Sequence, residues 1–268
     1  MHTILQAIKF YFTSKTNYRV HSPFLFALVS KVIDDRYFYA FDEAEYLREQ
    51  LLASKDKMQM IDLGAGSKKN NNEEKPISTV AKNSLSTPWQ CQMMFKIIEH
   101  LNCKQILEIG SSLGISTIYL AKANSASRVY SLEGNHDSIQ IAKNMASHAK
   151  LKNIDFVEGN FDDTLEKVLA QMSSVDFAFV DGNHRYEATV SYTKKILSSS
   201  HNLTAIVIDD IYWSEGMTKA WEELKKLKAV TASLDFFYYG VLFLNPDIKE
   251  PKHLKIIEAK LKPWQKYI

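Results

Sequence analysis

From Gln105 onward the chain alternates short apolar runs with amphipathic segments, and this alternation constrains the fold more than any other feature of the sequence. The apolar runs, rich in Ile, Val and Phe, are residues 105–109, 128–133, 154–158, 175–181 and 203–208. Helical patterns lie between them, for example at residues 136–149 and 185–198. Parallel neighbouring strands need a crossover connection, which is usually a helix. The alternation therefore predicts an α/β fold with a doubly wound, mostly parallel sheet.

The C-terminal part of the sequence predicts a different connection. A helical pattern near residues 215–227 is followed by two apolar runs, residues 230–237 and 241–244, which flank Tyr238-Tyr239-Gly240. Such a pair of runs predicts an antiparallel hairpin that completes the sheet. The Lys-rich residues 251–268 predict one final helix.

Residues 1–100 are of another kind, mostly helical in pattern and rich in aromatic side chains. Pro23 stands where a helix would begin, a position that suits proline. We therefore expect two domains, a helical N-terminal subdomain or lid at 1–100 and a second domain at 101–268. Within the first, residues 60–66 imitate a glycine loop, but the polar run 67–75 that follows predicts a surface loop instead of a buried helix.

Charge and cysteine content exclude several classes of protein. The 33 basic and 31 acidic residues leave a net charge of +2. This charge predicts no extended basic surface for nucleic acid, although a local basic patch remains an alternative. Two cysteines, Cys91 and Cys103, are too few for a disulfide framework and lack metal-ligand spacing. No apolar run approaches the roughly 18 residues of a membrane span, and the first residues lack a signal-peptide pattern. We expect a cytoplasmic protein with no membrane partner.

A strand, a glycine turn and a helix start are compressed into residues 105–117. Gly110 and Gly114 let the backbone turn sharply and come close to a ligand. A dinucleotide-binding turn has the pattern Gly-x-Gly-x-x-Gly, whereas this chain has Ser112 at the second glycine position. The segment thus predicts a nucleotide-cofactor site but disfavours pyrophosphate binding.

Glu108-Ile-Gly-Ser-Ser-Leu-Gly114 resembles the first motif of class I S-adenosylmethionine-dependent methyltransferases. The resemblance implies a seven-stranded, Rossmann-like methyltransferase fold with S-adenosylmethionine as cofactor. Glu133 ends the next strand at close to the roughly 20-residue spacing expected of a ribose-binding acid. The predicted cofactor-binding residues are Glu108, Gly110, Ser111, Gly114, Ser116, Glu133, Gly159, Asn160 and Asp181.

Three carboxylates stand at the ends of two neighbouring predicted strands. Asp181 ends the fourth run, and Asp209 and Asp210 directly follow the fifth. The carboxyl ends of adjacent parallel strands line one crevice, so these side chains should converge. Clustered carboxylates repel one another unless a cation neutralises them. Oxygen ligands favour Mg²⁺, with Ca²⁺ or Mn²⁺ as alternatives.

This arrangement resembles the divalent-metal-dependent O-methyltransferases, both the catechol type and, through Asp181-Gly-Asn-His184, the sugar and macrolide type. The resemblance implies that Asp181, Asp209 and Asp210 bind the metal and that His184 is the general base. The Asp-Asn pair of the catechol type is an Asp-Asp pair here. A plainer interpretation remains for each residue: Asp181 and Asp209 would cap helices, and His184 would be an ordinary loop residue.

We expect metal-dependent O-methylation of a small hydroxylated molecule. Two alternatives stay open: methylation of a tRNA base hydroxyl, and a methyltransferase-like binding protein without turnover. A homodimer also stays open. Tyr212 and Trp213, next to the acids, fit either core positions or a substrate platform.

Overall fold

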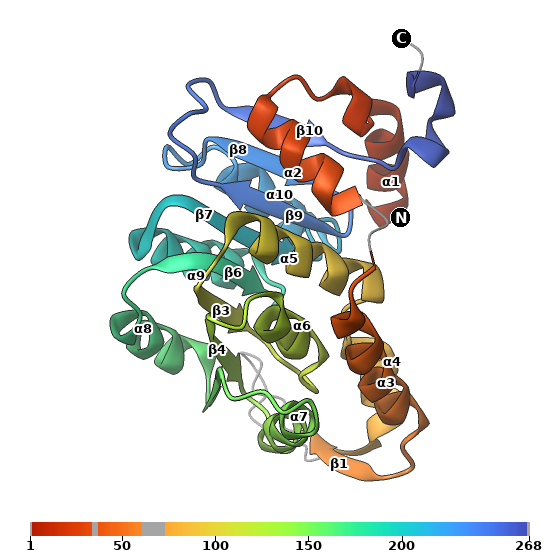
Figure 1. Cartoon of the computed structure of the whole chain (residues 1–268), viewed down its shortest axis with the longest axis vertical. Coiled ribbons are helices and arrows are strands. Elements are labelled where there is room, and N and C mark those ends of the chain that lie inside the picture. The colour runs from red at the N-terminus through yellow and green to blue at the C-terminus, as the bar shows by residue number, and fades with distance from the viewer. Residues whose placement is uncertain (1, 34–36, 61–72, 267–268) are drawn as a thin grey trace. The chain divides into compact units, whose positions relative to one another are not determined.

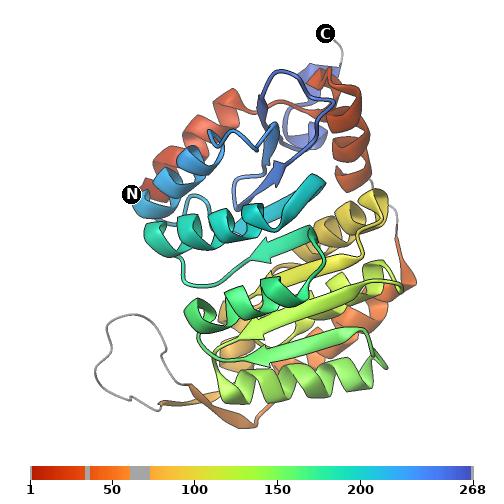
Figure 2. The same cartoon turned by 90° about the vertical axis from the view of Figure 1, so that its left-hand side faces the viewer.

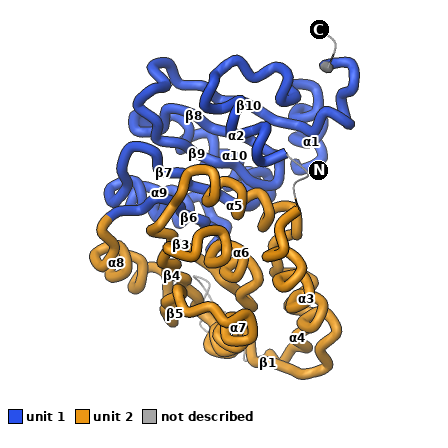
Figure 3. The backbone as a smooth tube through the Cα atoms, in the orientation of Figure 1, with its two compact units in different colours: residues 1–34, 174–268 blue, residues 35–173 orange. Residues whose placement is uncertain are grey.

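The computed structural model describes residues 2–33, 37–60 and 73–266. They form two compact units (Figure 3). Unit 1 joins residues 1–34 to residues 174–268, and unit 2 consists of residues 35–173. The predicted domain boundary near residue 100 stays a prediction.

Unit 2 contains three parallel strands, coloured yellow-green to green in Figures 1 and 2. They are β3 (Gln105–Ile109), β4 (Arg128–Glu133) and β5 (Ile154–Glu158), each followed by a helix: α6 (Ile115–Ala123), α7 (His136–His148) and α8 (Phe161–Gln171). Two of the helices begin at asparagine caps, because the Asn135 and Asn160 side chains accept backbone N–H groups of the first turn. The carboxyl ends of the three strands therefore lead directly into helix starts, where a cofactor motif is expected.

The N-terminal part of unit 2 is helical, with one short hairpin. Its elements are α3 (Tyr39–Ala53), β1 (Lys57–Met60), β2 (Glu73–Pro76), α4 (Ile77–Ser84) and α5 (Pro88–Leu101). The buried Phe41 ring on α3 lies 5.1 Å from Phe95 on α5 and 5.4 Å from Tyr119 on α6. Helices that precede the glycine motif in the sequence thus share an aromatic core with the helix that follows it.

Unit 1 carries a mixed sheet with the strand order β10-β8-β9-β7-β6. Its strands are β6 (Val175–Val180), β7 (Ser200–Asp209), β8 (Ala232–Asp235), β9 (Tyr239–Phe243) and β10 (Lys252–Lys255). β6 and β7 are parallel, whereas β9 runs antiparallel to both β7 and β8. Helix α9 (Tyr186–Ser198) follows β6, and helix α10 (Glu215–Leu224) follows β7. A Cβ atom on Gly240 would lie 2.5 Å from the buried ring of Trp221, so only glycine lets this helix pack on β9.

The first 33 residues belong to unit 1 and pack on its C-terminal part. Helix α1 (His2–Thr13) is joined through the 3₁₀ turn Asn17–Arg19 to α2 (Pro23–Ile33). The Lys15 N–H donates to the Lys255 carbonyl, and the Lys15 carbonyl accepts from the Ile257 N–H. Lys15 therefore lies beside the end of β10 and bonds to it through its backbone. The N-terminus and the last strand are therefore held together by backbone hydrogen bonds.

The predicted α/β fold class is confirmed, as are the antiparallel hairpin and the helix that starts at Pro23. The prediction of one helix over residues 251–268 is wrong: residues 252–255 form β10, and two 3₁₀ turns follow at Ala259–Leu261 and Pro263–Lys266. β10 comes in addition to the seven predicted strands and pairs with β8. Pairing with an edge strand outweighs the weak helical preference of this Lys-rich segment.

Of the polar run 67–75, residues 73–75 belong to β2, and residues 67–72 lie outside the described part of the chain. The glycine-loop look-alike at 60–66 falls there too, apart from Met60, the last residue of β1. None of the described helices is long and apolar enough to cross a membrane.

Candidate functional site

The glycine loop after β3 adopts the conformation that its sequence predicts. Gly110 and Gly114 have φ angles of 91° and 87°, a backbone region that residues other than glycine rarely adopt. A Cβ atom on Gly114 would lie 2.7 Å from Cβ of Ala142 and 2.8 Å from its Cα. Gly114 is therefore needed twice, for the turn and for the close approach of α7.

Glu108 is fully buried beneath this loop. Its Oε2 atom accepts hydrogen bonds from the hydroxyls of Thr117 (2.5 Å) and Ser131 (2.7 Å). Burial raises the pKa of the Glu108 carboxyl, and the hydroxyls of Ser116, Thr117 and Ser131 oppose that rise. In this structure Glu108 braces the start of α6 against β4, and its predicted contact with a cofactor stays a prediction.

Glu133, at the end of β4, lies half-buried and is held by the backbone. Its Oε2 accepts from the N–H of Ser112 and its Oε1 from the N–H of Asn135, both at 2.8 Å. Burial raises the pKa of this carboxyl, while the surrounding N–H groups lower it. A carboxylate fixed in this way against the glycine loop can accept hydrogen bonds from a ribose diol.

Two buried polar atoms of the motif have no hydrogen-bond partner among the described residues. They are the Ser111 hydroxyl and Oε1 of Glu108. Unpaired buried polar atoms are uncommon in folded proteins and call for an explanation such as a ligand or water. Together with the carboxylate of Glu133, they fit a cofactor that carries an ammonium group and ribose hydroxyls.

Gly159 and Asn160 follow β5 as predicted. Gly159 has a φ of 137° and donates its N–H to the Glu133 carbonyl at 3.0 Å. The Asn160 side-chain oxygen caps α8 by accepting from Asp162 N–H at 2.9 Å. The oxygen therefore has a structural role, and the predicted cofactor contact of Asn160 stays a prediction.

In unit 1 the structure brings Asp181, His184 and Asp210 together. Asp181 follows β6, Asp209 ends β7, and Asp210 stands just beyond it with a left-handed φ of 54°. Nε2 of His184 lies 3.5 Å from Oδ1 of Asp181, and Nδ1 lies 3.7 Å from Oδ2 of Asp210. Burial raises the pKa of the Asp210 carboxyl, and the neighbouring His184 opposes that rise.

This cluster, as it stands, is an imidazole between two carboxylates and not a metal cage. Among the described residues, no group of three or more His, Cys, Asp or Glu side chains is arranged to hold a metal ion. The donor chemistry of Asp181, Asp209 and Asp210 suits a hard cation. The predicted metal ligands thus stay a prediction.

The two aromatic residues that follow the acids have different environments. Tyr212 is buried, and its hydroxyl donates to Asp235 at 2.5 Å, so it is a core residue. Trp213 is 68% exposed, and its backbone N–H closes a turn on the Asp210 carbonyl at 2.9 Å. Only Trp213 keeps a surface that a substrate could reach.

Sequence reasoning missed Ser112, which it treated only as a lost glycine. Ser112 has a φ of 46°, donates its N–H to Glu133, and lies with its hydroxyl 2.6 Å from that of Ser84 on α4. The available signal was its position inside the Gly-x-x-x-Gly loop. No pattern in the sequence pointed to Ser84, because the contact joins segments that are far apart in the chain.

Residues 107–211 match the family described as a methyltransferase domain. Within these residues the chain is similar to methyltransferase domains. The match begins inside β3 and ends just after Asp210, so it spans the glycine loop, Glu133 and the acid cluster. The resemblance to class I S-adenosylmethionine-dependent methyltransferases is confirmed.

Solved structures share the fold of this chain at low sequence identity. An O-methyltransferase from Bacillus cereus, in complex with S-adenosylhomocysteine, is 19% identical with a TM-score of 0.57, over 81% of this chain and 96% of that one. An O-methyltransferase from Streptomyces achromogenes, in complex with S-adenosylmethionine, is 17% identical with a TM-score of 0.57, over 78% and 91%. No curated protein matches the sequence closely enough to count as a relative.

Proposed function

We propose that the protein is an S-adenosylmethionine-dependent O-methyltransferase that acts on a small hydroxylated molecule. One observation carries the proposal: the Glu133 carboxylate is held by the N–H groups of Ser112 and Asn135, within a methyltransferase domain. The names of the structurally similar O-methyltransferases support the same reaction class.

When bound, S-adenosylmethionine supplies an electrophilic methyl group, and the protein has to align an oxygen nucleophile and remove its proton. In unit 2, Glu133 accepts from the ribose hydroxyls and fixes the cofactor, while the glycine loop keeps side chains out of its way. In unit 1, neutral His184 takes the proton from the acceptor hydroxyl. Its neighbours Asp181 and Asp210 orient the ring and face the positive charge that it acquires.

Cofactor binding is tested by calorimetric titration with S-adenosylhomocysteine. Glu133→Gln should weaken binding because an amide cannot accept both ribose hydroxyls. Glu158→Gln is the matched control, since Glu158 pairs with Glu133 in register on the next strand and is exposed. Wild-type protein that binds NAD but not S-adenosylhomocysteine would refute the proposal.

The base role is tested with methyl-labelled cofactor and a metabolite extract, followed by the acceptor that it reveals. His184→Gln should lower kcat by about 10²- to 10⁴-fold while the cofactor Kd stays constant. His201→Gln is the control, because His201 pairs with Asp176 at the start of β6. The pH dependence of kcat is compared between wild type and His184→Gln. Equal rates and the same loss of rate toward acidic pH in both would mean that solvent, and not His184, accepts the proton.

A finer proposal is that a divalent cation such as Mg²⁺ binds at Asp181, Asp209 and Asp210. It is supported by three carboxylates at the ends of two paired parallel strands. Asp210→Asn keeps a residue that tolerates the left-handed backbone and removes one charge. Mn²⁺ binding is measured by electron paramagnetic resonance, with Asp155→Asn as the control. Wild type and Asp155→Asn should bind Mn²⁺ equally well, and Asp210→Asn should bind it more weakly. Equal Mn²⁺ binding by all three proteins would sink the idea.

One observation favours the alternative of a tRNA acceptor. A hollow of about 450 Å³ in unit 2 is lined by Lys143, Lys150 and Lys152 together with Phe156. Lysines with an aromatic neighbour suit phosphates and a stacked base. Salt-dependent tRNA binding that is lost in Lys150→Gln, together with methyl transfer to RNA, would replace the small-molecule proposal. Cofactor binding with no transfer to either class would favour the non-catalytic alternative.

A further inference from the structure

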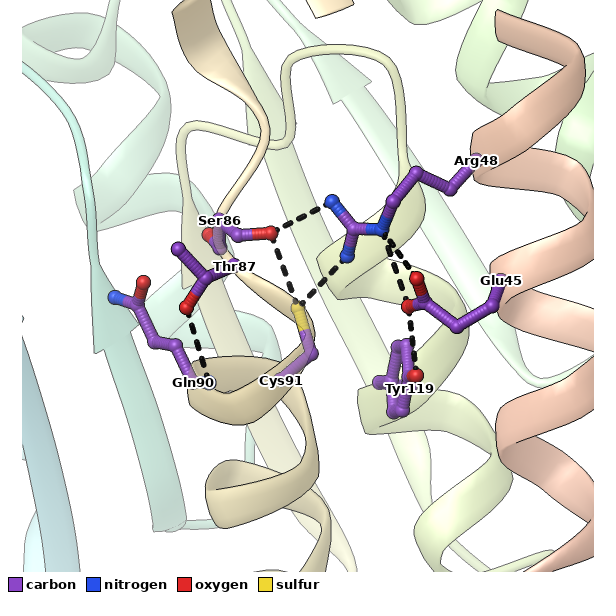
Figure 4. A network of polar contacts seen from close by, with 7 residues as sticks. All are labelled: Glu45, Arg48, Ser86, Thr87, Gln90, Cys91 and Tyr119. Carbon is purple, nitrogen blue, oxygen red and sulfur yellow. Dashed lines mark hydrogen bonds and ion pairs between the residues drawn. The ribbon is translucent and has the colours of Figure 1, made fainter. Parts of the chain in front are cut away.

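Arg48 on α3 is the centre of a buried polar network in unit 2 (Figure 4). Its Nε donates to both oxygens of Glu45, at 2.9 and 3.1 Å, and its Nη1 donates to the Ser86 carbonyl at 2.8 Å. The Tyr119 hydroxyl on α6 donates to Oε1 of Glu45 at 2.8 Å. Arg48 is only 7% exposed. The network therefore joins α3, α6 and the link between α4 and α5.

The Ser86 carbonyl is held by two donors. The Cys91 thiol on α5 also points to it, with Sγ 3.8 Å from the oxygen, and Nη2 of Arg48 lies 3.7 Å from that sulfur. Burial raises the pKa of the Cys91 thiol to about 12, so it keeps its proton and can donate. A guanidinium fork with fixed acceptors is more restrictive than a single point charge. The backbone at Ser86 is consequently fixed.

Ser86 lies two residues beyond Ser84, the last residue of α4. The Ser84 hydroxyl donates to the Val80 carbonyl at 2.9 Å and lies 2.6 Å from the Ser112 hydroxyl. Because the single Ser84 proton is used on Val80, Ser112 is the donor in the contact between the two hydroxyls. Ser84 therefore acts as an acceptor that receives the glycine loop.

Ser112 is the residue that most needs such support. Its φ of 46° lies in the left-handed region, where serine is uncommon, and it stands where a dinucleotide motif would have glycine. Its N–H is also one of the two donors that hold Glu133. A short path of contacts thus runs from Arg48 through the segment 84–86 to Ser112 and the proposed ribose-binding acid.

We propose that Arg48 is a positioning residue for the cofactor: it fixes Ser86, and so holds Ser84 against Ser112 and sets the position of Glu133. The proposal rests on the proposed cofactor site. It assigns the helices before the glycine motif a part in cofactor affinity, in addition to their packing on α6.

The test is a double-mutant cycle on the Kd for S-adenosylhomocysteine, measured by calorimetry at a temperature where every variant is folded. Arg48→Lys keeps the charge but loses the fork, and Ser84→Ala removes the acceptor for Ser112 together with the bond of Ser84 to the Val80 carbonyl. Each should weaken binding roughly 2- to 12-fold, the range for one hydrogen bond. Since both act through one path, the double variant should bind about as weakly as the weaker single variant.

Arg128→Lys is the matched control, because Arg128 pairs with Asp155 on the exposed side of β4 and β5 and should leave the Kd unchanged. If the network only stabilises the packing of the helices, Arg48→Lys should have a lower melting temperature and a wild-type Kd. That result would overturn the inference. Fully multiplicative effects in the double variant would also overturn it. Should Arg48→Lys fail to fold, Ser84→Ala alone decides, and a wild-type Kd for it refutes the path. Absence of binding by wild type would instead refute the proposed function itself.

Discussion

Gly114→Ala should destabilise the protein by about 2–5 kcal/mol, the sum of two effects. A left-handed backbone costs a residue with a Cβ about 1–2 kcal/mol, and Gly114 has a φ of 87°. The added Cβ would also lie 2.7 and 2.8 Å from the Cβ and Cα atoms of Ala142 on α7. The Cα atom cannot move aside without shifting the helix, and overpacking of this kind costs about 1–3 kcal/mol.

Urea unfolding followed by circular dichroism measures the change, with Gly216→Ala as the control. Gly216 lies in α10, and its nearest atom to an added Cβ is 3.6 Å away, an ordinary contact. Alanine in a helix is better by roughly 0.5–1 kcal/mol, so the control should be stabilised. The same substitution thus has opposite signs at two sites. A Gly114→Ala midpoint at or above that of wild type would refute the reasoning from backbone and packing.

Three further predictions concern buried and exposed charges. Burial raises the pKa of the Glu108 carboxyl, so the folded protein keeps a proton that the unfolded chain releases. The retained proton stabilises the folded protein. This stabilisation is fully present below the ordinary glutamate pKa of about 4.3 and is lost as pH rises through the raised pKa of the folded state. In urea titrations from about pH 4 to 7, Glu108→Gln should therefore gain stability relative to wild type, and a difference independent of pH would contradict this. Tyr212→Phe removes a donor to the buried Asp235 carboxylate and should lower the free energy of unfolding by about 1–3 kcal/mol, measured by calorimetry. An unchanged melting temperature would count against the role of this bond. Arg128→Ala removes an exposed ion pair with Asp155 and should leave the melting temperature unchanged, so a loss as large as that of Tyr212→Phe would show the pair to be more than a surface contact.

Most of the strand and helix order could be predicted from local pattern. The runs at 105–109, 128–133 and 154–158 are the strands β3, β4 and β5 with the same bounds, because each gathers aliphatic and aromatic residues between turn residues. The segment 252–255 could not be predicted in this way. Its sequence, Lys-His-Leu-Lys, has no apolar period, and only the open edge of β8 makes it a strand.

The sequence by itself determined the glycine loop with its left-handed turns, and the placement of Glu133 and the three aspartates at strand ends. These follow from local rules: glycine alone tolerates the backbone of the turn, and parallel strands deliver their last residues to one edge. Only the tertiary structure decided where these side chains point. Glu108 turned inward to the hydroxyls of Thr117 and Ser131, and His184 settled between Asp181 and Asp210.

The network around Arg48 also belongs to the tertiary structure alone. Arg48, Ser86 and Ser112 are separated by long stretches of chain, and no spacing relates them. A sequence pattern records periodicity within one element, whereas the partner of a buried charge is chosen when elements pack and desolvation forces each donor to find an acceptor. That is why the order of strands and helices could be predicted from the residues, while the support of the glycine loop emerged only from the packed helices.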